Sequence, residues 1–265
     1  MTSPPRTQPT ATGASAGADH AQDAGSPGPA IVEEVAVWLE VNGEPTVTWM
    51  CTPDQLEELA VGWLHGEGYI RSLADLKRLR PCATDLGFWA EVEPALVQAV
   101  KQEDRRRVLA SGCGAVTTAL GDPATLARGP RTSVPSVSEM RALFKAVFQR
   151  GDRYHETGGI HAAALTDGNA LLSHAEDIGR HNAVDKVIGA AILAGRRLEG
   201  TGLLVTGRIS GELAFKAARA GLGYVATPSV PSSLAVEIAR RSGMTLVGRA
   251  VSGSPQLHQF DASAS

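Results

Sequence analysis

The sequence predicts an α/β protein with a mixed, partly parallel sheet and a smaller α+β subdomain on its N-terminal side. In the second half, apolar strand-like segments at 202–206, 223–227 and 244–248 alternate with amphipathic segments at 210–221 and 232–243. That alternation is typical of parallel strands joined by right-handed helical crossovers. Upstream of it, the chain carries β-hairpin signals instead.

Composition is that of an ordinary globular protein. The chain has 265 residues, of which 43% are hydrophobic and 20% charged, with a net charge of −3. A normal core is therefore expected, and no basic surface for nucleic acid or membrane is indicated. No apolar run approaches the roughly 20 residues that span a bilayer, so we expect a cytoplasmic protein. The 3 cysteines are widely spaced, which disfavours disulfides and thiolate metal clusters.

Three regions are expected along the chain. Residues 1–30 are rich in Pro, Gly, Ala, Ser and Thr and are predicted to be a disordered tail. Residues 31–135 are expected to form the N-terminal subdomain, ending in a proline-containing linker. Residues 136–265 are expected to form the α/β domain.

Local signals place the elements of the N-terminal subdomain. Asn42-Gly43 predicts a hairpin turn, because both residues tolerate positive φ. Thr52 is predicted to cap a helix, with Pro53 at the first helical position, Gln55 completing a capping box and Gly66 at the end.

Similar signals mark the second region. Ser136 and Glu139 predict a capping box for a helix that Gly151 closes. Asp167-Gly168 predicts a hairpin turn, and Asn182 is expected to cap the helix that follows the second strand.

Cys113 is the first candidate for chemistry. It stands in Ser111-Gly112-Cys113-Gly114, where two glycines permit a tight, exposed loop. A thiolate that must attack a sulfane donor and then release the outer sulfur needs such access. The alternative is a small buried cysteine in a turn, since cysteine is usually buried.

A second group of candidates lies in Thr157–His161 and Glu176–Lys186. Imidazole and charged groups in a loop that opens a helix can hold an anion or tune a thiolate; the alternative is a structural ion pair. A metal site is not expected, because the two histidines lack a convincing third ligand. The candidates are His161, Arg180, His181 and Lys186.

A third group follows two apolar strands and opens two helices, at 206–212 and 227–233. The N–H groups and the positive dipole end of a helix N-terminus attract phosphate, and a guanidinium adds a bidentate contact. Two such turns at strand C-termini favour a nucleotide-sized ligand in one crevice. The candidates are Arg208, Ser210, Ser229 and Ser232.

These segments together resemble the FdhD/NarQ family of formate dehydrogenase accessory sulfurtransferases. The resemblance runs from about residue 32 to 250 and is most distinctive in EDIGRHNAVDK; it also includes TGGIHAAAL and GRISGELAFKAARAG. It implies a sulfur carrier that takes sulfur from a cysteine desulfurase. The sulfur passes to bis-molybdopterin guanine dinucleotide, the molybdenum cofactor, before its insertion into formate dehydrogenase. The resemblance also implies a cytidine-deaminase-like three-layer fold and a homodimer, without the deaminase zinc.

Carried over by position, the persulfide cysteine of the family is Cys113. The family's usual second loop cysteine is replaced by Val116, which leaves a single thiol. The segment that contacts the guanine dinucleotide in relatives is implied at Arg249, Ala250, Val251, Ser252, Gly253 and Ser254. Here Arg249 replaces an aromatic residue, and Val251 and Ser254 replace arginines.

Two alternatives stay open. One is a chaperone or diverged paralogue that binds the molybdopterin guanine dinucleotide without transferring sulfur, as the missing second cysteine suggests. The other is a deaminase-like hydrolase, which requires zinc and which the scarcity of cysteines disfavours.

Overall fold

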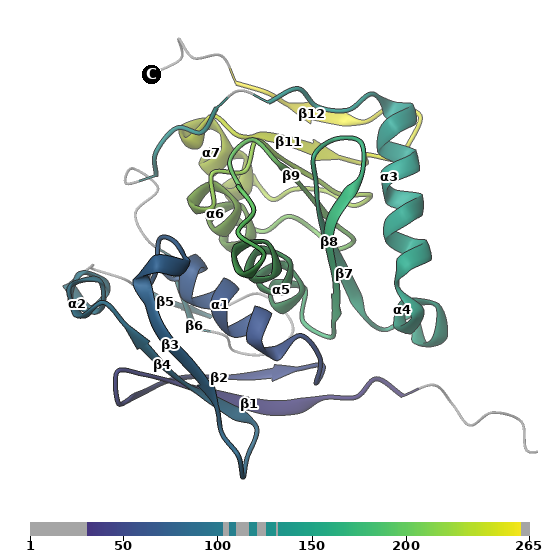
Figure 1. The fold of residues 1–265 in the computed structure, drawn as a ribbon. Coiled ribbons are helices and arrows are strands. Elements are labelled where there is room, and N and C mark those ends of the chain that lie inside the picture. Colours follow the sequence, from purple (N-terminus) through teal and green to yellow (C-terminus); the bar gives the residue numbers. More distant parts are fainter. Residues whose placement is uncertain (1–30, 103–105, 110–116, 121–125, 131, 261–265) are drawn as a thin grey trace, which may run out of the picture. The chain divides into compact units, whose positions relative to one another are not determined.

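The computed structural model describes residues 31–102, 126–130 and 132–260 in full, and 106–109 and 117–120 by their backbone (Figure 1). The predicted tail at 1–30 and the candidate Cys113 lie outside the described residues. Both predictions therefore stay predictions.

A four-stranded sheet forms on the N-terminal side, in the order β2-β1-β4-β3. Asn42 and Gly43 have φ of 49° and 84°, which confirms the predicted hairpin between β1 and β2. β1 pairs with β4 in parallel, whereas the other two pairings are antiparallel. The strands are β1 (Val35–Val41), β2 (Glu44–Cys51), β3 (Leu76–Pro81) and β4 (Gly87–Val92).

The helix after β2 begins later than predicted. α1 spans Leu56–Gly66, and Gln55 occupies its N-cap position with φ of 48° and no side-chain cap. The predicted cap at Thr52 was wrong because its hydroxyl accepts a hydrogen bond from the Ile178 N–H instead. The predictions also missed the helices at Pro94–Gln102 and Asp152–Thr157. The remaining elements are η1 (Leu73–Asp75), helix α2 (Pro94–Gln102) and the antiparallel pair β5 (Arg106–Leu109) and β6 (Thr117–Leu120).

The predicted parallel region is confirmed within a six-stranded sheet of order β12-β11-β10-β9-β7-β8. β9, β10 and β11 run parallel, and β7 and β8 form the predicted hairpin. The sequence signals did not predict β12, which pairs antiparallel with the strand at 244–248. The strands are β7 (His161–Thr166), β8 (Leu171–Asp177), β9 (Gly202–Val205), β10 (Tyr224–Ala226), β11 (Thr245–Gly248) and β12 (Gln256–His258).

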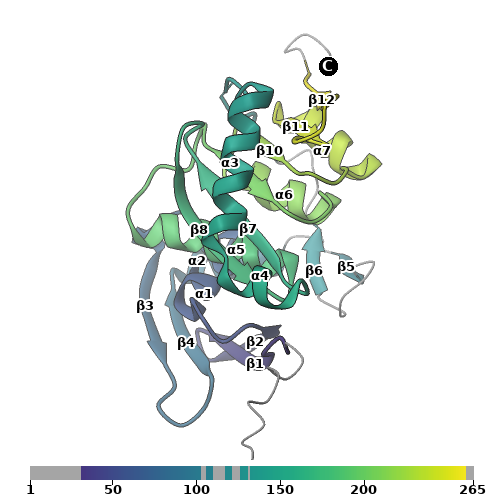
Figure 2. The same cartoon turned by 90° about the vertical axis from the view of Figure 1, so that its right-hand side faces the viewer.

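Helices cover both faces of this sheet (Figures 1 and 2). α3 (Val137–Arg150) has the predicted capping box of Ser136 and Glu139 and packs on one face through Met140 and Phe144. The short α4 (Asp152–Thr157) follows it. The other face is covered by α5 (Arg180–Leu193), α6 (Gly211–Arg219) and α7 (Ser233–Ser242).

The start of α5 corrects another prediction. Gly179, and not Asn182, occupies the N-cap position. The Asn182 amide instead donates to the Met50 carbonyl and to Asp177, at 2.9 and 3.0 Å. The side chain is thus used to join β2 to the end of β8.

α1 lies between the four-stranded sheet and α5, so one hydrophobic core runs from that sheet to α5 and the six-stranded sheet. Ile31 and the residues after it form one compact unit. The predicted boundary between residues 135 and 136 stays a prediction. The longest helices in the described ranges, α3 and α5, have 14 residues each, and none is long and apolar enough to cross a membrane.

Candidate functional site

The two turns that were predicted to bind phosphate lie side by side at the carboxyl ends of β9 and β10. The Thr227 hydroxyl donates to the Gly207 carbonyl at 2.7 Å. Ile209 forms a bridge with Pro231, and the Ser232 N–H donates to the Ile209 carbonyl at 2.9 Å. The turns therefore form one continuous surface.

The segment after β11 joins the same surface. Main-chain N–H groups of Arg249 and Ala250 donate to the carbonyls of Ser229 and Thr227, at 2.7 and 2.9 Å. Arg249 is in the left-handed region with φ of 49°, and it is exposed. The Ala250 side chain is only 1% exposed and anchors the segment in the core. Its methyl group is unavailable to a ligand in this conformation.

His161 and Arg180 reach this edge from neighbouring elements. β7 runs antiparallel to β9, so its first residue, His161, lies beside the turn that follows β9. A Cβ placed on Gly207 would lie 3.3 Å from His161 Nδ1 and 3.5 Å from Arg180 Cδ. Burial, assisted by the Arg180 charge and opposed by Asp177, lowers the pKa of His161. The imidazole is therefore neutral at pH 7.

His181 and Glu212 meet where the first turns of α5 and α6 face each other. His181 Nε2 and Glu212 Oε2 are 3.4 Å apart, without forming a hydrogen bond. Burial, and then the Lys216 and Arg180 charges, lower the pKa of His181 to about 3. Burial raises the pKa of Glu212 against the opposing effect of the same two cations. The contact is thus between a neutral imidazole and a carboxyl group and is not an ion pair.

A second contact between these helices lies one turn further along. Lys216 Nζ donates to Asp185 Oδ2 at 2.6 Å, and both side chains are almost fully buried. Burial raises the pKa of Asp185 to about 6, with Lys216 opposing. His181 and Asp185 are four residues apart in α5, and so lie on one face of that helix. The same spacing separates Glu212 from Lys216 in α6. Sequence reasoning missed these pairs, although the i,i+4 spacing in both motifs was a signal.

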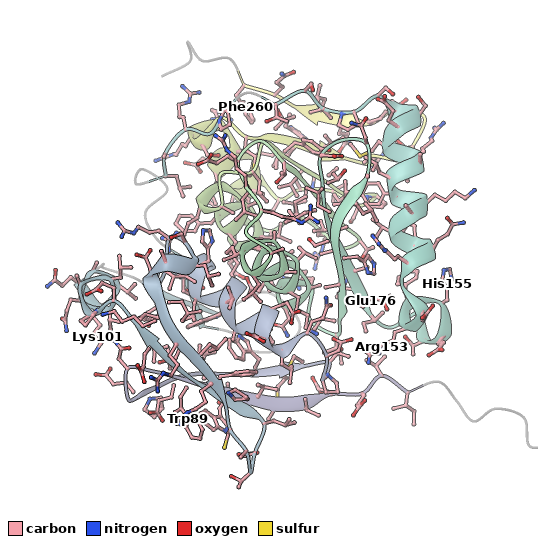
Figure 3. The ribbon with its side chains drawn as sticks, in the orientation of Figure 1. Trp89, Lys101, Arg153, His155, Glu176 and Phe260 are labelled. Carbon is pink, nitrogen blue, oxygen red and sulfur yellow. The ribbon has the colours of Figure 1, made fainter. Side chains whose placement is uncertain are left out.

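Lys186 lies in the protein interior, away from the other candidates. Its side chain is fully buried, and its ammonium contacts Asp54 at 2.7 Å, Asp177 at 2.8 Å and the Thr52 carbonyl at 3.1 Å. Asp54 also pairs with Arg153. In this conformation Lys186 ties the chain before α1 to the end of β8 and cannot touch a ligand. Arg153 and Glu176 lie close together nearby, where Glu176 accepts the Arg153 N–H (Figure 3).

Positive potential gathers at the carboxyl edge. α5, α6 and α7 all begin there, and their N-terminal N–H groups carry partial positive charge. Ser210 and Ser232 are the N-caps of α6 and α7, so their hydroxyl oxygens accept helix N–H groups. Arg208 is exposed and makes no hydrogen bond or ion pair within the described ranges. The edge therefore suits an anion.

The structure brings most of the described candidates to this one edge: His161, Arg180, His181, Arg208, Ser210, Ser229, Ser232 and the segment 249–254. A cavity of about 1010 Å³ lies elsewhere, beside the C-terminal ends of α5 and α6. The chemistry of the edge outweighs size as an indicator of the site. Among the residues that the structure describes, no group of three or more His, Cys, Asp or Glu side chains is placed to hold a metal ion.

The two described cysteines differ in their surroundings. Cys51 is completely buried, and burial together with the Asp177 charge raises the pKa of its thiol to about 12. Cys82 is partly exposed after β3, and a hydrogen bond with Thr84 lowers the pKa of its thiol. Cys51 is thus unsuited to carry sulfur.

Comparisons with known proteins agree along most of the chain. The FdhD/NarQ family profile matches residues 32–259. Proteins named sulfur carrier protein FdhD are 34% identical in Bacillus subtilis (84% of this chain, 86% of the relative) and 36% identical in Burkholderia mallei (81% and 83%).

A solved structure shows the same fold. It is a crystal structure from Desulfotalea psychrophila, described as a formate dehydrogenase accessory protein, with a TM-score of 0.69 and 24% identity, covering 86% of this chain and 87% of that one. The fold, the extent of the match and the identity to the curated relatives agree: the chain belongs to the FdhD/NarQ family.

Proposed function

We propose that this chain is a sulfur carrier required for formate dehydrogenase activity. The relatives with that name are 34–36% identical over more than four-fifths of the chain. In the proposal, the Cys113 thiolate attacks the outer sulfur of a persulfide on a cysteine desulfurase. A new S–S bond forms on Cys113 and the donor leaves as a thiolate, so the step is redox neutral.

The acceptor in the proposal is bis-molybdopterin guanine dinucleotide, before its insertion into the enzyme. The observation that supports a nucleotide ligand is the carboxyl edge itself, where three helix N-termini meet Arg208, which is exposed and has no hydrogen bond or ion pair among the described residues. N–H groups and guanidinium together suit a diphosphate. His161 and Arg180, packed against Gly207, would flank that group.

Further parts of the proposal rest on the family relationship. They are a homodimer in the cytoplasm, a cytidine-deaminase-like three-layer arrangement around the six-stranded sheet, and the division into 31–135 and 136–265. Sheet faces covered by α3 and by α5–α7 support the three layers.

Mass spectrometry after incubation with a cysteine desulfurase and cysteine tests the carrier role. We expect the protein to gain one sulfur, and Cys113→Ser to abolish both the adduct and the activation of formate dehydrogenase. Cys51→Ser and Cys82→Ser should retain both. Full client activation by Cys113→Ser would favour the alternative, a chaperone that binds the molybdopterin guanine dinucleotide without sulfur transfer.

Calorimetry with GDP tests the ligand. Arg208→Ala should weaken binding by roughly 1.5 to 3 kcal/mol, the range for a charge-assisted hydrogen bond. Val251→Ala and Ser254→Ala should change it much less. An unchanged affinity in Arg208→Ala would remove that side chain from the site.

A further inference from the structure

A side chain distant in sequence holds the segment after β11. Arg141, in the second turn of α3, donates from Nε to the Val251 carbonyl and from Nη2 to the Ser252 carbonyl, both at 3.0 Å. The planar guanidinium fork thus clamps two consecutive peptide groups. None of the sequence signals discussed above involves Arg141.

The clamp sets the direction of one N–H group. No described peptide bond is cis, so the carbonyl of Ser252 and the N–H of Gly253 point in opposite directions from the same planar unit. With that carbonyl held by Arg141, the Gly253 N–H points away from α3. A Cβ placed on Gly253 would meet no atom within 4 Å, so the space beside it is open.

Most other N–H groups of the segment are already used. The N–H groups of Arg249 and Ala250 bond to the turn after β10, that of Ser252 bonds to the Arg249 carbonyl, and that of Ser254 bonds to the Ser252 hydroxyl. The Gly253 N–H has no hydrogen-bond acceptor within the described residues. It is therefore available to a ligand oxygen.

We infer that Arg141 is a positioning residue that fixes the Ser252–Gly253 peptide so that its N–H donates to an anionic oxygen of the nucleotide ligand. The inference rests on the proposed function. It also explains how this chain can use the segment although Val251 and Ser254 provide no guanidinium. In this chain a main-chain N–H group, and not an arginine side chain, recognises the nucleotide at this segment.

Position 253 offers a matched pair of variants. Gly253→Pro removes the N–H, and Gly253→Ala retains it in open space. The φ of Gly253 does not lie in the left-handed region, so alanine is not excluded by the backbone there. In calorimetry with GDP, we expect Gly253→Pro to lose about tenfold in affinity and Gly253→Ala to stay within about twofold.

Variants on α3 test the clamp. Arg141→Gln should also lose about tenfold, Arg141→Lys should lose less because an ammonium reaches one carbonyl, and the exposed Lys145→Gln should bind like the parent. Combining Arg141→Gln with Gly253→Pro should cost little more than either alone, because both remove the same contact. A merely structural role of Arg141 would give additive losses.

Equal GDP affinities of Gly253→Pro and Gly253→Ala would overturn the inference and leave the proposed function standing. An unchanged affinity of Arg141→Gln would do the same. If the parent itself fails to bind GDP, the nucleotide site and the inference both fall, and the Cys113 persulfide measurement then reports on sulfur transfer by itself.

Discussion

At the level of single residues, the surroundings of each thiol set how fast it reacts. The Cys51 thiol has no exposed surface and a pKa of about 12. Cys82 is partly exposed, with its pKa lowered by Thr84. Because the thiolate is the reactive form, iodoacetamide at pH 8 should modify Cys82 and spare Cys51 in the native protein. Peptide mass spectrometry should detect modification at both residues in urea.

Native modification of Cys51 at a rate comparable with Cys82 would show that β2 opens readily. A Cys82→Ser variant is the useful control, because it removes the faster reaction without changing the surroundings of Cys51.

The buried imidazole of His181 predicts a dependence of stability on pH. Its folded pKa is about 3, whereas an unfolded histidine titrates near 6.5. Between these values the unfolded chain binds more protons, so this group's contribution falls as pH decreases from 6.5. The contribution lost by pH 5 is on the order of 1 to 2 kcal/mol. His181→Gln should remove that loss, as measured by urea unfolding at pH 6.5 and at pH 5.

Asp185 acts in the opposite direction, since burial raises its pKa to about 6 and its contribution falls as pH increases. The informative quantity is therefore the difference in the free energy of unfolding between the variant and the parent at each pH. His155, exposed on α4, provides the matched control. A difference between His181→Gln and the parent that does not vary with pH would contradict a buried neutral imidazole.

Among the elements, α1 and α5 approach each other closely at two glycines. A Cβ on Gly62 would lie 1.8 Å from the Asp185 carbonyl oxygen, and one on Gly189 would lie 1.9 Å from that of Glu58. Neither backbone can yield without moving a helix. Gly189→Ala should therefore reduce the free energy of unfolding by about 2 kcal/mol or more.

Urea unfolding measures this loss, and Gly159→Ala is the control because its new Cβ would have its nearest neighbour at 3.5 Å. Equal stability of both variants would contradict the close approach of α1 and α5 at Gly189.

The buried pair between α5 and α6 gives a second prediction at this level. Lys216→Met leaves the Asp185 carboxylate without its cation and should cost about 3 to 5 kcal/mol. The double variant Asp185→Leu with Lys216→Met should recover most of that loss, because no buried charge remains. A double-mutant cycle in urea measures the coupling, and additive losses would contradict it.

Elements defined by local chemistry were predictable. The Ser136–Glu139 capping box and the Asn42-Gly43 turn need only neighbouring residues. The caps assigned to Thr52 and Asn182 failed because each side chain bonds a partner more than 120 residues away. Local patterns contain no information about such partners.

For the whole molecule, the alternating strands and helices were enough to predict the parallel core of the six-stranded sheet. They did not predict the parallel pairing of β1 with β4 or the three-residue β12, because both depend on contacts between distant segments. The predicted proximity of the two turns after β9 and β10 is confirmed, whereas the contacts of Arg141, Glu212 and Lys216 were not predicted. Their roles come from packing between helices.

The predicted tail also has a consequence for the whole chain. Residues from Ile31 onward already bury a continuous core. A chain that starts at Ile31 should therefore melt within about 2 °C of the full-length protein. Differential scanning calorimetry measures both, and a large decrease would show that residues 1–30 pack on the folded part.

The buried ammonium of Lys186 also bears on the order of events during synthesis. Its partner Thr52 precedes it by 134 residues, so at roughly 5 to 20 residues per second the ribosome needs about 7 to 27 s to make the second partner after the first. Throughout that interval the Thr52 carbonyl has no Lys186 ammonium from which to accept a hydrogen bond. In the nascent chain the Cys51 thiol therefore lacks Asp177 and Lys186, two charged groups that act on it after folding, until the end of β8 and the start of α5 have emerged.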